Sequence, residues 1–274
     1  MPAFLKAEDV IAAGFDEIQH INQLMLNFLV KPDTDTRTLD RFYLPAKQVA
    51  DLDLQSKAVQ DFIRLLKSHN VTVDPTLATF DFLKKTDGTV GEPWRAIVTH
   101  LPPDIQRAYA RAELDIPDEA TAERYAKSYA KMIEFVGMMY KAGIPVVAGT
   151  DELAGFTLQG ELELLVKAGL TASEALQVAT LNGARYSNVE QHKGQIKVGF
   201  DADLLLVDGD PTQNISDIRK LALVITQGKA IVPTDLYQKL GVKPFVTDSI
   251  KIRDFAPAQA QGGGKTSTGH RHLH

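Results

Sequence analysis

The first residue whose position suggests chemistry is an acid at the end of an apolar run. The run from Ile144 to Ala148 is followed by the small residues Gly149 and Thr150 and then by Asp151. In proteins that alternate parallel strands with helices, side chains at the carboxyl ends of the strands converge on one site. A carboxylate at this position can bind a cation or accept a proton from a water molecule bound to that cation. Asp151 could equally cap the turn or helix that follows, which is a common role of aspartate.

His20 has a similar position, because it follows a short strand predicted over Phe15–Ile18. A neutral imidazole there is a natural ligand of zinc. A histidine that is hydrogen-bonded inside a loop is the more frequent use of an isolated histidine, and local sequence leaves both interpretations open. The remaining histidines indicate other environments: a helix C-terminus for His69, a surface loop for His100, a polar turn for His192 and a terminal tail for His270, His272 and His274.

Composition limits the kinds of partner and the ligands that a metal could have. The chain has 274 residues, a net charge of −5 and no cysteine, and its isoelectric point is near 5.8. This charge argues against nucleic acid or an anionic membrane surface as the main partner. No apolar stretch approaches the ~20 residues of a membrane-spanning helix. Because the chain has no cysteine, any metal would be held by histidine, aspartate or glutamate. The absence of cysteine does not identify the cellular compartment.

The elements that must position His20 and Asp151 alternate between strands and helices. Apolar residues at helical spacing predict a helix around Val59–Leu66 and a long one over residues 118–143. The predicted buried faces comprise Val59, Phe62, Ile63 and Leu66 on the first helix and Tyr125, Tyr129, Met132, Val136 and Met139 on the second. Strands are predicted over Val71–Pro75 and Ile144–Thr150. This alternation predicts parallel strands joined by helical crossovers. The other predicted segments are helices at 6–13, 23–30 and 157–169, a helix that opens with the capping box of Thr171 and Glu174, a loop at 31–46 and a long loop with short helices at 80–115.

The pattern changes after Gly194, where β runs separated by glycine and aspartate have no helix between them. We therefore expect three parts: a partial (β/α) barrel over residues 1–190, a separate β unit over residues 191–250, and a disordered tail over residues 254–274. The tail contains "GGGKTSTG", which lacks the first glycine and the preceding strand of a phosphate-binding loop. Signatures of serine hydrolases, zincins and dinucleotide-binding folds do not occur in the chain.

Several segments resemble one family in their order, spacing and wording. They read "AGFDEIQHIN", "VTVDPTLA", "AGIPVVAGTD", "FTLQGELELLVKAGLTASEALQVATLNGARY" and "GQIKVGFDADLLLVDGDP". Together they resemble the C-terminal half of the metal-dependent amidohydrolase superfamily, in its imidazolonepropionase-like and Xaa-Pro dipeptidase-like branch. With weaker matches the resemblance extends over residues 4–233.

The resemblance implies an α/β fold in which strands six to eight of a (β/α)8 TIM barrel precede the C-terminal strands of a small β-sandwich. Phe15–His20, Val71–Pro75 and Ile144–Thr150 would be the three barrel strands. In this family the histidine of strand six ligates a metal, a role that maps to His20. The aspartate of strand eight ligates the metal and takes a proton from the attacking water, a role that maps to Asp151.

The resemblance also implies a divalent metal, typically zinc, with one or two ions, and hydrolysis of a small-molecule amide, a dipeptide or a cyclic amide. The family's His-x-His pair, its strand-four lysine and its strand-five histidine have no counterpart in this sequence. We therefore expect a truncated chain that is complemented by self-association or by an N-terminal chain, or a reading frame that starts upstream of Met1. The alternative is a non-catalytic fragment that serves as a binding or assembly partner.

Overall fold

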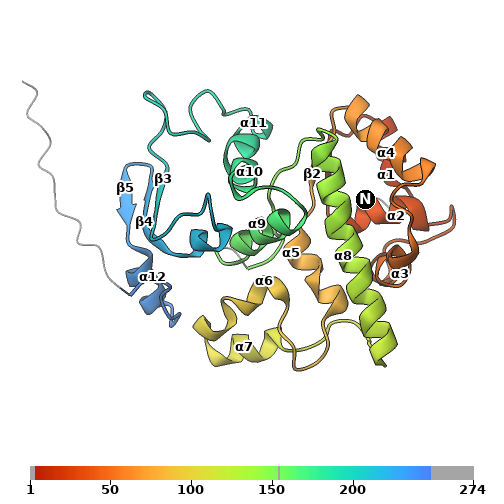
Figure 1. The fold of residues 1–274 in the computed structure, drawn as a ribbon, viewed down its shortest axis with the longest axis horizontal. Coiled ribbons are helices and arrows are strands. Elements are labelled where there is room, and N and C mark those ends of the chain that lie inside the picture. The colour runs from red at the N-terminus through yellow and green to blue at the C-terminus, as the bar shows by residue number, and fades with distance from the viewer. Residues whose placement is uncertain (1–3, 154, 248–274) are drawn as a thin grey trace, which may run out of the picture.

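The computed structural model describes residues 4–153 and 155–247, which form three groups of elements (Figure 1). The helices α1 to α4 gather around the long helix α8 at one end, α9 and α10 lie in the middle, and a β-sheet with α12 lies at the other end. The predicted tail from Asp254 onward, including its three histidines, lies outside the described residues. Among the helices that are described, none combines the length and the apolar character needed to cross a membrane.

The element bounds follow the predicted alternation closely in the first 170 residues. The first half contains α1 (Ala7–Ala12), β1 (Glu17–Gln19), α2 (Ile21–Leu29), α3 (Asp40–Gln48), α4 (Lys57–Ser68), β2 (Thr72–Asp74), α5 (Leu77–Phe80), α6 (Glu92–Arg95), α7 (Pro103–Tyr109) and α8 (Glu119–Lys141). The second half contains α9 (Thr157–Lys167), α10 (Ala172–Gln177), α11 (Gly183–Tyr186), β3 (Leu204–Val207), β4 (Leu221–Thr226), β5 (Lys229–Ile231) and α12 (Pro233–Lys239).

The parallel core consists of β1, β2 and a third segment, residues 144–147. β1 and β2 pair in parallel with Ile18 opposite Val73. The third segment joins the other side of β2 through a single parallel bridge between Val73 and Val146. The prediction of a regular strand over Ile144–Thr150 is thus wrong in extent. Pro145 has no N–H group to donate to β2. The segment is held to β2 by two other hydrogen bonds: the Val73 N–H donates to the Pro145 oxygen over 2.9 Å, and the Val147 N–H donates to the Val73 oxygen over 3.0 Å.

Helix α8 is 23 residues long and contributes nine buried residues. The residues predicted for its buried side are all buried, as are the four apolar residues that indicated α4. Each large apolar side chain removed from water contributes roughly 1.5–3 kcal/mol to the hydrophobic driving force. The buried set on α8 comprises Tyr125, Tyr129, Met132, Val136 and Met139, and the set on α4 comprises Val59, Phe62, Ile63 and Leu66.

Helix α3 corrects the prediction of a loop over residues 31–46, because it continues through Pro45. A proline inside a helix removes the hydrogen bond to the carbonyl four residues earlier, which here belongs to Arg41. That carbonyl instead accepts a hydrogen bond from the Asn22 side chain, with a distance of 3.2 Å from Nδ2. A tertiary contact thus replaces the missing helical bond, and it joins α3 to α2.

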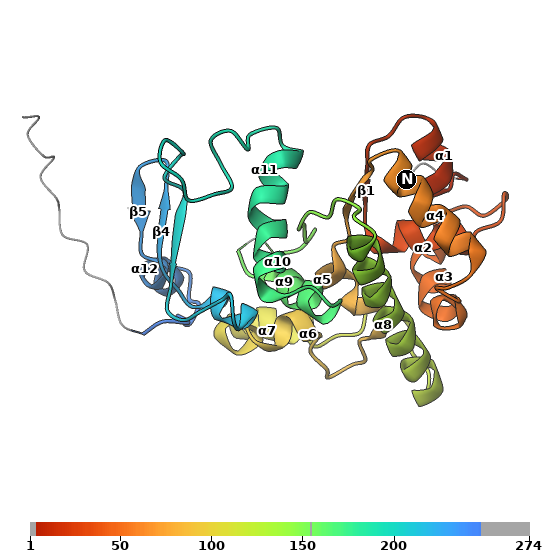
Figure 2. The same cartoon turned by 45° about the horizontal axis from the view of Figure 1, so that its top comes forward.

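The β unit after Gly194 is a three-stranded antiparallel sheet in the order β3-β4-β5. Strand β3 begins only at Leu204, so the predicted β run from Gly194 onward is strand only in its last part. Figure 2 shows this sheet standing apart from the parallel core, with α10 and α11 between them. The exposed fractions of Leu205 and Leu206 are 55% and 52%, so apolar residues of the sheet remain exposed.

Candidate functional site

The chain turns at the carboxyl ends of the three parallel segments, and each turn places a polar residue there. His20 follows β1, Asp74 is the last residue of β2, and Asp151 follows the third segment. The distance between His20 Nε2 and Asp151 Oδ2 is 3.8 Å, and the carboxylate of Asp151 is largely exposed. The structure therefore brings together the two residues that the sequence singled out, although 131 positions separate them (151 − 20).

Three non-glycine residues of this edge have left-handed backbone conformations. The φ angles are +71° at His20, +44° at Thr76 and +50° at Asp151. Such conformations cost on the order of 1–3 kcal/mol each and persist only where the surrounding structure imposes them. Two backbone hydrogen bonds hold the left-handed conformation of His20. The His20 N–H donates to the Asp74 oxygen over 2.8 Å, and the Ile21 N–H donates to the Pro75 oxygen over 2.9 Å.

The His20 ring is oriented by a hydrogen bond from its other nitrogen. Nδ1 lies 2.9 Å from the hydroxyl oxygen of Thr76, which leaves Nε2 directed toward Asp151. Burial lowers the pKa of His20, while the negative charge of Asp151 opposes this shift. A lowered pKa favours the neutral imidazole, which is the form that ligates metals. A hydrogen-bond partner on the other ring nitrogen is typical of histidines that ligate metals.

Asp74 was not predicted as a site residue, although it stands at a strand end as His20 and Asp151 do. Its Oδ1 accepts hydrogen bonds from the backbone N–H groups of Gly149, at 3.1 Å, and Thr76, at 3.3 Å. Burial raises the pKa of its carboxyl to about 6, against the effect of these hydrogen bonds. A Cβ atom at position 149 would lie 1.9 Å from Asp74 Oδ2, so the glycine is needed for this close approach. Asp74 thereby fixes the segment that carries Asp151.

Glu161 is a second acid that sequence reasoning missed. It lies on α9, is fully buried, and accepts a 2.7 Å hydrogen bond from the Ala78 N–H through Oε2. Burial raises the pKa of its carboxyl to about 8, and the nearby charge of Asp74 adds to this shift. The sequence does contain one indication of this burial. Glu161 precedes Leu165 by four residues, which places both side chains on the same, buried face of α9. Glu161 holds the start of α5, directly after Thr76.

A pocket of about 320 Å³ opens beside His20 and Asp151. Asn22 on α2 and Arg41 on α3 supply polar groups to its wall. The phenyl rings of Phe42, Phe80 and Phe82 also line it, with ring centroids 5.3–6.4 Å apart. The pocket thus combines an acid, an imidazole, a guanidinium group and an aromatic wall.

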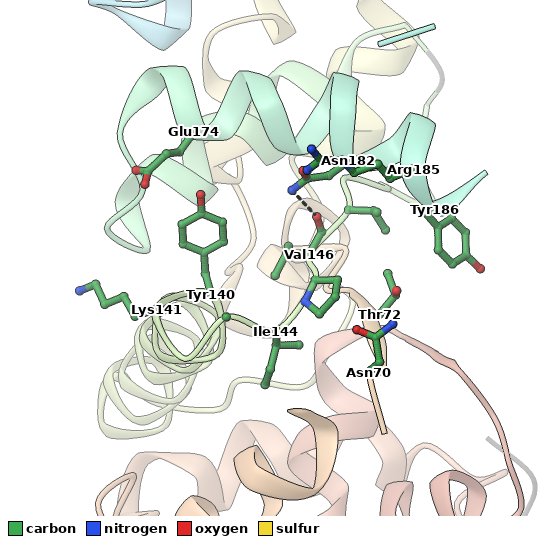
Figure 3. A pocket seen from close by; sticks show the side chains of 13 residues that line it. Asn70, Thr72, Tyr140, Lys141, Ile144, Val146, Glu174, Asn182, Arg185 and Tyr186 are labelled. Atoms are coloured by element: carbon green, nitrogen blue, oxygen red, sulfur yellow. Dashed lines mark hydrogen bonds between the residues drawn. The ribbon is translucent and has the colours of Figure 1, made fainter. Parts of the chain in front are cut away.

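A second hollow, of about 690 Å³, lies near the amino ends of β2 and the third segment (Figure 3). Its wall includes Tyr140 from the end of α8, Glu174 from α10 and Arg185 from α11. The Asn182 side chain donates a 3.4 Å hydrogen bond to the Val146 oxygen across it. The two hollows share no lining residue, so the second one belongs to another part of the surface.

The other described histidines lie away from this site. His69 Nδ1 is 3.1 Å from the Leu65 oxygen, which confirms its predicted place at a helix C-terminus. His100 lies 2.8 Å from the Lys243 oxygen. His192 pairs with Asp201 at 3.5 Å. None of them lines the pocket beside His20.

The donor atoms of His20 and Asp151 suit one divalent metal ion in type and come close in spacing. Zinc binds imidazole nitrogen and carboxylate oxygen at ~2.0–2.2 Å, so two such ligand atoms of a tetrahedral ion lie about 3.3–3.6 Å apart. The separation of 3.8 Å is a few tenths of an ångström longer than this. Within residues 4–153 and 155–247, however, no group of three or more histidine, aspartate or glutamate side chains that could hold a metal is found. The described residues thus offer a pair of ligands rather than a full set.

Comparisons with known proteins point to one family. Residues 45–231 match the model of the Amidohydrolase family. The chain is 37% identical over 67 residues to the 5'-deoxyadenosine deaminase of Methanobrevibacter smithii, a match that covers 24% of this chain and 15% of that protein. It is 29% identical over 137 residues to the ochratoxinase of Aspergillus niger, which covers 48% of this chain and 26% of that protein. These matches span about a quarter or less of each curated relative.

A solved structure shows a related fold. The structure of bottromycin amidohydrolase superposes with a TM-score of 0.55 at 19% identity, over 86% of this chain and 52% of that one. This likeness concerns the arrangement of the elements. It agrees with the superfamily resemblance of the sequence, which the family match confirms.

Proposed function

Because the chain belongs to the amidohydrolase family, we propose that it contributes to a metal-dependent hydrolase acting on C–N bonds. The substrates proposed are amides, dipeptides and cyclic amides, as in the imidazolonepropionase-like and Xaa-Pro dipeptidase-like branch. The observation that carries the proposal is the 3.8 Å approach of His20 and Asp151 at the common edge of the parallel segments.

In this proposal the parallel core is part of a (β/α)8 barrel. β1, β2 and the third segment correspond to strands six, seven and eight, and β3 to β5 correspond to strands of the small β-sandwich. The parallel order of the three segments supports this assignment. The remaining strands and ligands would come from a complementing N-terminal chain or from self-association.

A divalent ion, most simply zinc, would be held by His20 and Asp151 and would activate water and polarise the scissile carbonyl. Asp151 acts as the general base, because its exposed carboxylate can accept the proton of the attacking water. It then delivers that proton to the leaving nitrogen, so that the amine departs neutral. His20 would ligate the ion as a neutral imidazole, a form that burial favours by lowering its pKa, and Thr76 orients its ring.

A second candidate function is that of a non-catalytic binding or assembly partner. It is favoured by a hollow of about 850 Å³ between α10–α11 and the β-sheet, and by the exposed leucines of β3. Exposed apolar surface of this kind marks sites of association. The two candidates make different predictions for metal content and for activity.

The test is zinc-dependent hydrolysis of a panel of N-acyl amino acids, dipeptides and cyclic amides. The rate is measured from the amino groups that hydrolysis releases. Asp151→Asn should lower the rate at least about 100-fold, since general base catalysis contributes ~10²–10⁴-fold. Asp208→Asn, at an exposed carboxylate of the β unit, is the matched control. A monomer that holds no stoichiometric metal and hydrolyses none of these substrates would contradict the enzymatic proposal for this chain on its own and support the second candidate.

A further inference from the structure

Residues 88–110 form a closed excursion between β2 and α8 that the proposed hydrolysis does not use. The two ends of the excursion are joined at its base, because the Gly88 N–H donates to the Ala110 oxygen over 2.8 Å. Helices α6 and α7 lie within it, below α5 and α9 in Figure 1. Long excursions of this kind from a compact core more often serve a function than a purely connecting role.

The excursion has a small apolar cluster of its own. Trp94, Ile97 and Leu101 are buried there together with Val242, a residue that follows α12. This cluster is separate from the main core around α8. Helix α7 contributes no buried residue at all. A region with so few buried apolar contacts opens at a lower free energy than the main core.

The beginning of the excursion is fixed to α9. The Lys167 ammonium group pairs with the Glu92 carboxylate over 2.7 Å. The buried guanidinium of Arg219 pairs with Glu163 over 2.8 Å and donates to the Pro93 oxygen over 3.4 Å. Helix α6 is therefore anchored by contacts that do not depend on the rest of the excursion.

The later part of the excursion is held by the C-terminal segment instead. The Lys243 N–H donates to the His100 oxygen, and His100 Nδ1 donates to the Lys243 oxygen, each over 2.8 Å. The rings of His100 and Phe245 are stacked, with centroids 4.1 Å apart. The Thr234 hydroxyl of α12 donates to the Val246 oxygen over 2.9 Å, which ties the same segment to α12.

Tyr109 links this arrangement to the turn that carries Asp151. Its ring is stacked on Trp94, with centroids 3.7 Å apart. Burial, together with the neighbouring carboxylate of Glu152, raises the pKa of Tyr109 to about 12. Glu152 directly follows Asp151 in the chain. The later part of the excursion thus reaches the edge where His20 and Asp151 meet.

We propose that residues 241–247 are a clasp that holds residues 96–110 closed against the Asp151 turn, and that this unit opens while the parallel core stays folded. Opening separates Tyr109 from Glu152, so the surroundings of Asp151 depend on the clasp. This equilibrium involves neither metal nor substrate, and it stands or falls apart from the proposed reaction.

Two measurements on the full chain report this opening. Trp94 is the single tryptophan of the chain, so quenching of its fluorescence by acrylamide measures its exposure. Trypsin cleavage after Arg107, an exposed residue of α7, measures the population of the open form when opening is fast. Cleavage after Arg64, an exposed residue of α4 in the main core, measures global unfolding in the same samples.

The variants Phe245→Ala and His100→Ala each remove one ring of the stacked pair. We expect each to raise cleavage after Arg107 at least about 10-fold, because aromatic pairs contribute beyond their buried area. Quenching of Trp94 should rise at least about twofold, while far-UV circular dichroism stays unchanged. Phe15→Ala, at a phenylalanine that is 56% exposed, is the matched control and should behave like the wild type.

Three results would overturn the clasp. The first is unchanged quenching and cleavage in both variants, and the second is an equal rise in Phe15→Ala. The third is cleavage after Arg64 that rises as much as cleavage after Arg107, or variants that fail to fold, because the excursion would then open only with the whole chain. Increased cleavage after Arg107 alone, accompanied by exposure of Trp94, would support it.

Discussion

The buried acid on α9 makes a quantitative prediction for the pH dependence of stability. The pKa of Glu161 is raised from 4.5 to about 8 in the folded chain, because burial penalises its charged form. An acid with a raised folded pKa binds its proton more tightly in the folded state than in the unfolded state. Its contribution to stability is therefore complete below pH 4.5 and is lost progressively as the pH rises toward 8.

The magnitude follows from the size of the shift. Each pH unit between the two pKa values changes the free energy of unfolding by about 1.4 kcal/mol. Between pH 5 and pH 8, Glu161 should therefore lower the free energy of unfolding by about 3–4 kcal/mol, integrated over both titrations. Glu161→Gln removes this titration and keeps the size of the side chain and an acceptor oxygen for the Ala78 N–H.

The assay is urea denaturation of the wild type and Glu161→Gln at several pH values from 5 to 8. We expect the two proteins to have similar free energies of unfolding at pH 5, and the variant to become more stable by about 3–4 kcal/mol relative to the wild type at pH 8. Asp74 titrates in both proteins, so its own contribution cancels in the difference, and only its charge effect on Glu161 remains as part of the Glu161 shift. Parallel pH profiles would refute the reasoning, because they would show that Glu161 is ionised or exposed.

Three further changes test the packing around the site. Gly149→Ala should destabilise the chain by at least about 1–3 kcal/mol in urea denaturation, because the new Cβ would lie 1.9 Å from an oxygen of Asp74; wild-type stability would contradict that close approach. Thr76→Val should weaken zinc binding about 10- to 100-fold in calorimetry, because it removes the hydroxyl that orients His20, and an unchanged affinity would show that the ring needs no such partner. Ser128→Ala should cost about 1–3 kcal/mol of stability, because the buried hydroxyl bonds two backbone groups at 2.7 and 2.9 Å, and a neutral effect would place those groups in contact with water.

The sequence identified His20 and Asp151 because each lies just after a short predicted strand, a local pattern that parallel packing converts into proximity. Asp74 has the same kind of position, but its role depends on a backbone N–H 75 positions away, at Gly149, which no local pattern reveals. Glu161 lies within an ordinary amphipathic pattern, and only the fold shows that its carboxyl is enclosed.

The same distinction applies to the fold. The helices α4 and α8 were predicted well because apolar residues at helical spacing specify their buried faces. Helix α3 was missed because a polar segment precedes it and because it contains Pro45, and the bond that compensates for the proline comes from Asn22 on α2. The third parallel segment was predicted as a longer strand because its apolar run is longer than its actual pairing with β2.

The most direct test of the proposed site is the zinc affinity of the full chain and its variants. His270, His272 and His274 are replaced by alanine in every protein compared, because histidines of the tail could also bind zinc. Titration calorimetry should then show that Asp151→Asn weakens zinc binding at least about 10-fold, while Asp208→Asn binds like the parent protein. If Asp151→Asn binds zinc as tightly as the parent, then Asp151 is not a zinc ligand and the proposed site is contradicted. A parent protein that binds no zinc would contradict metal binding by His20 and Asp151 in this chain on its own.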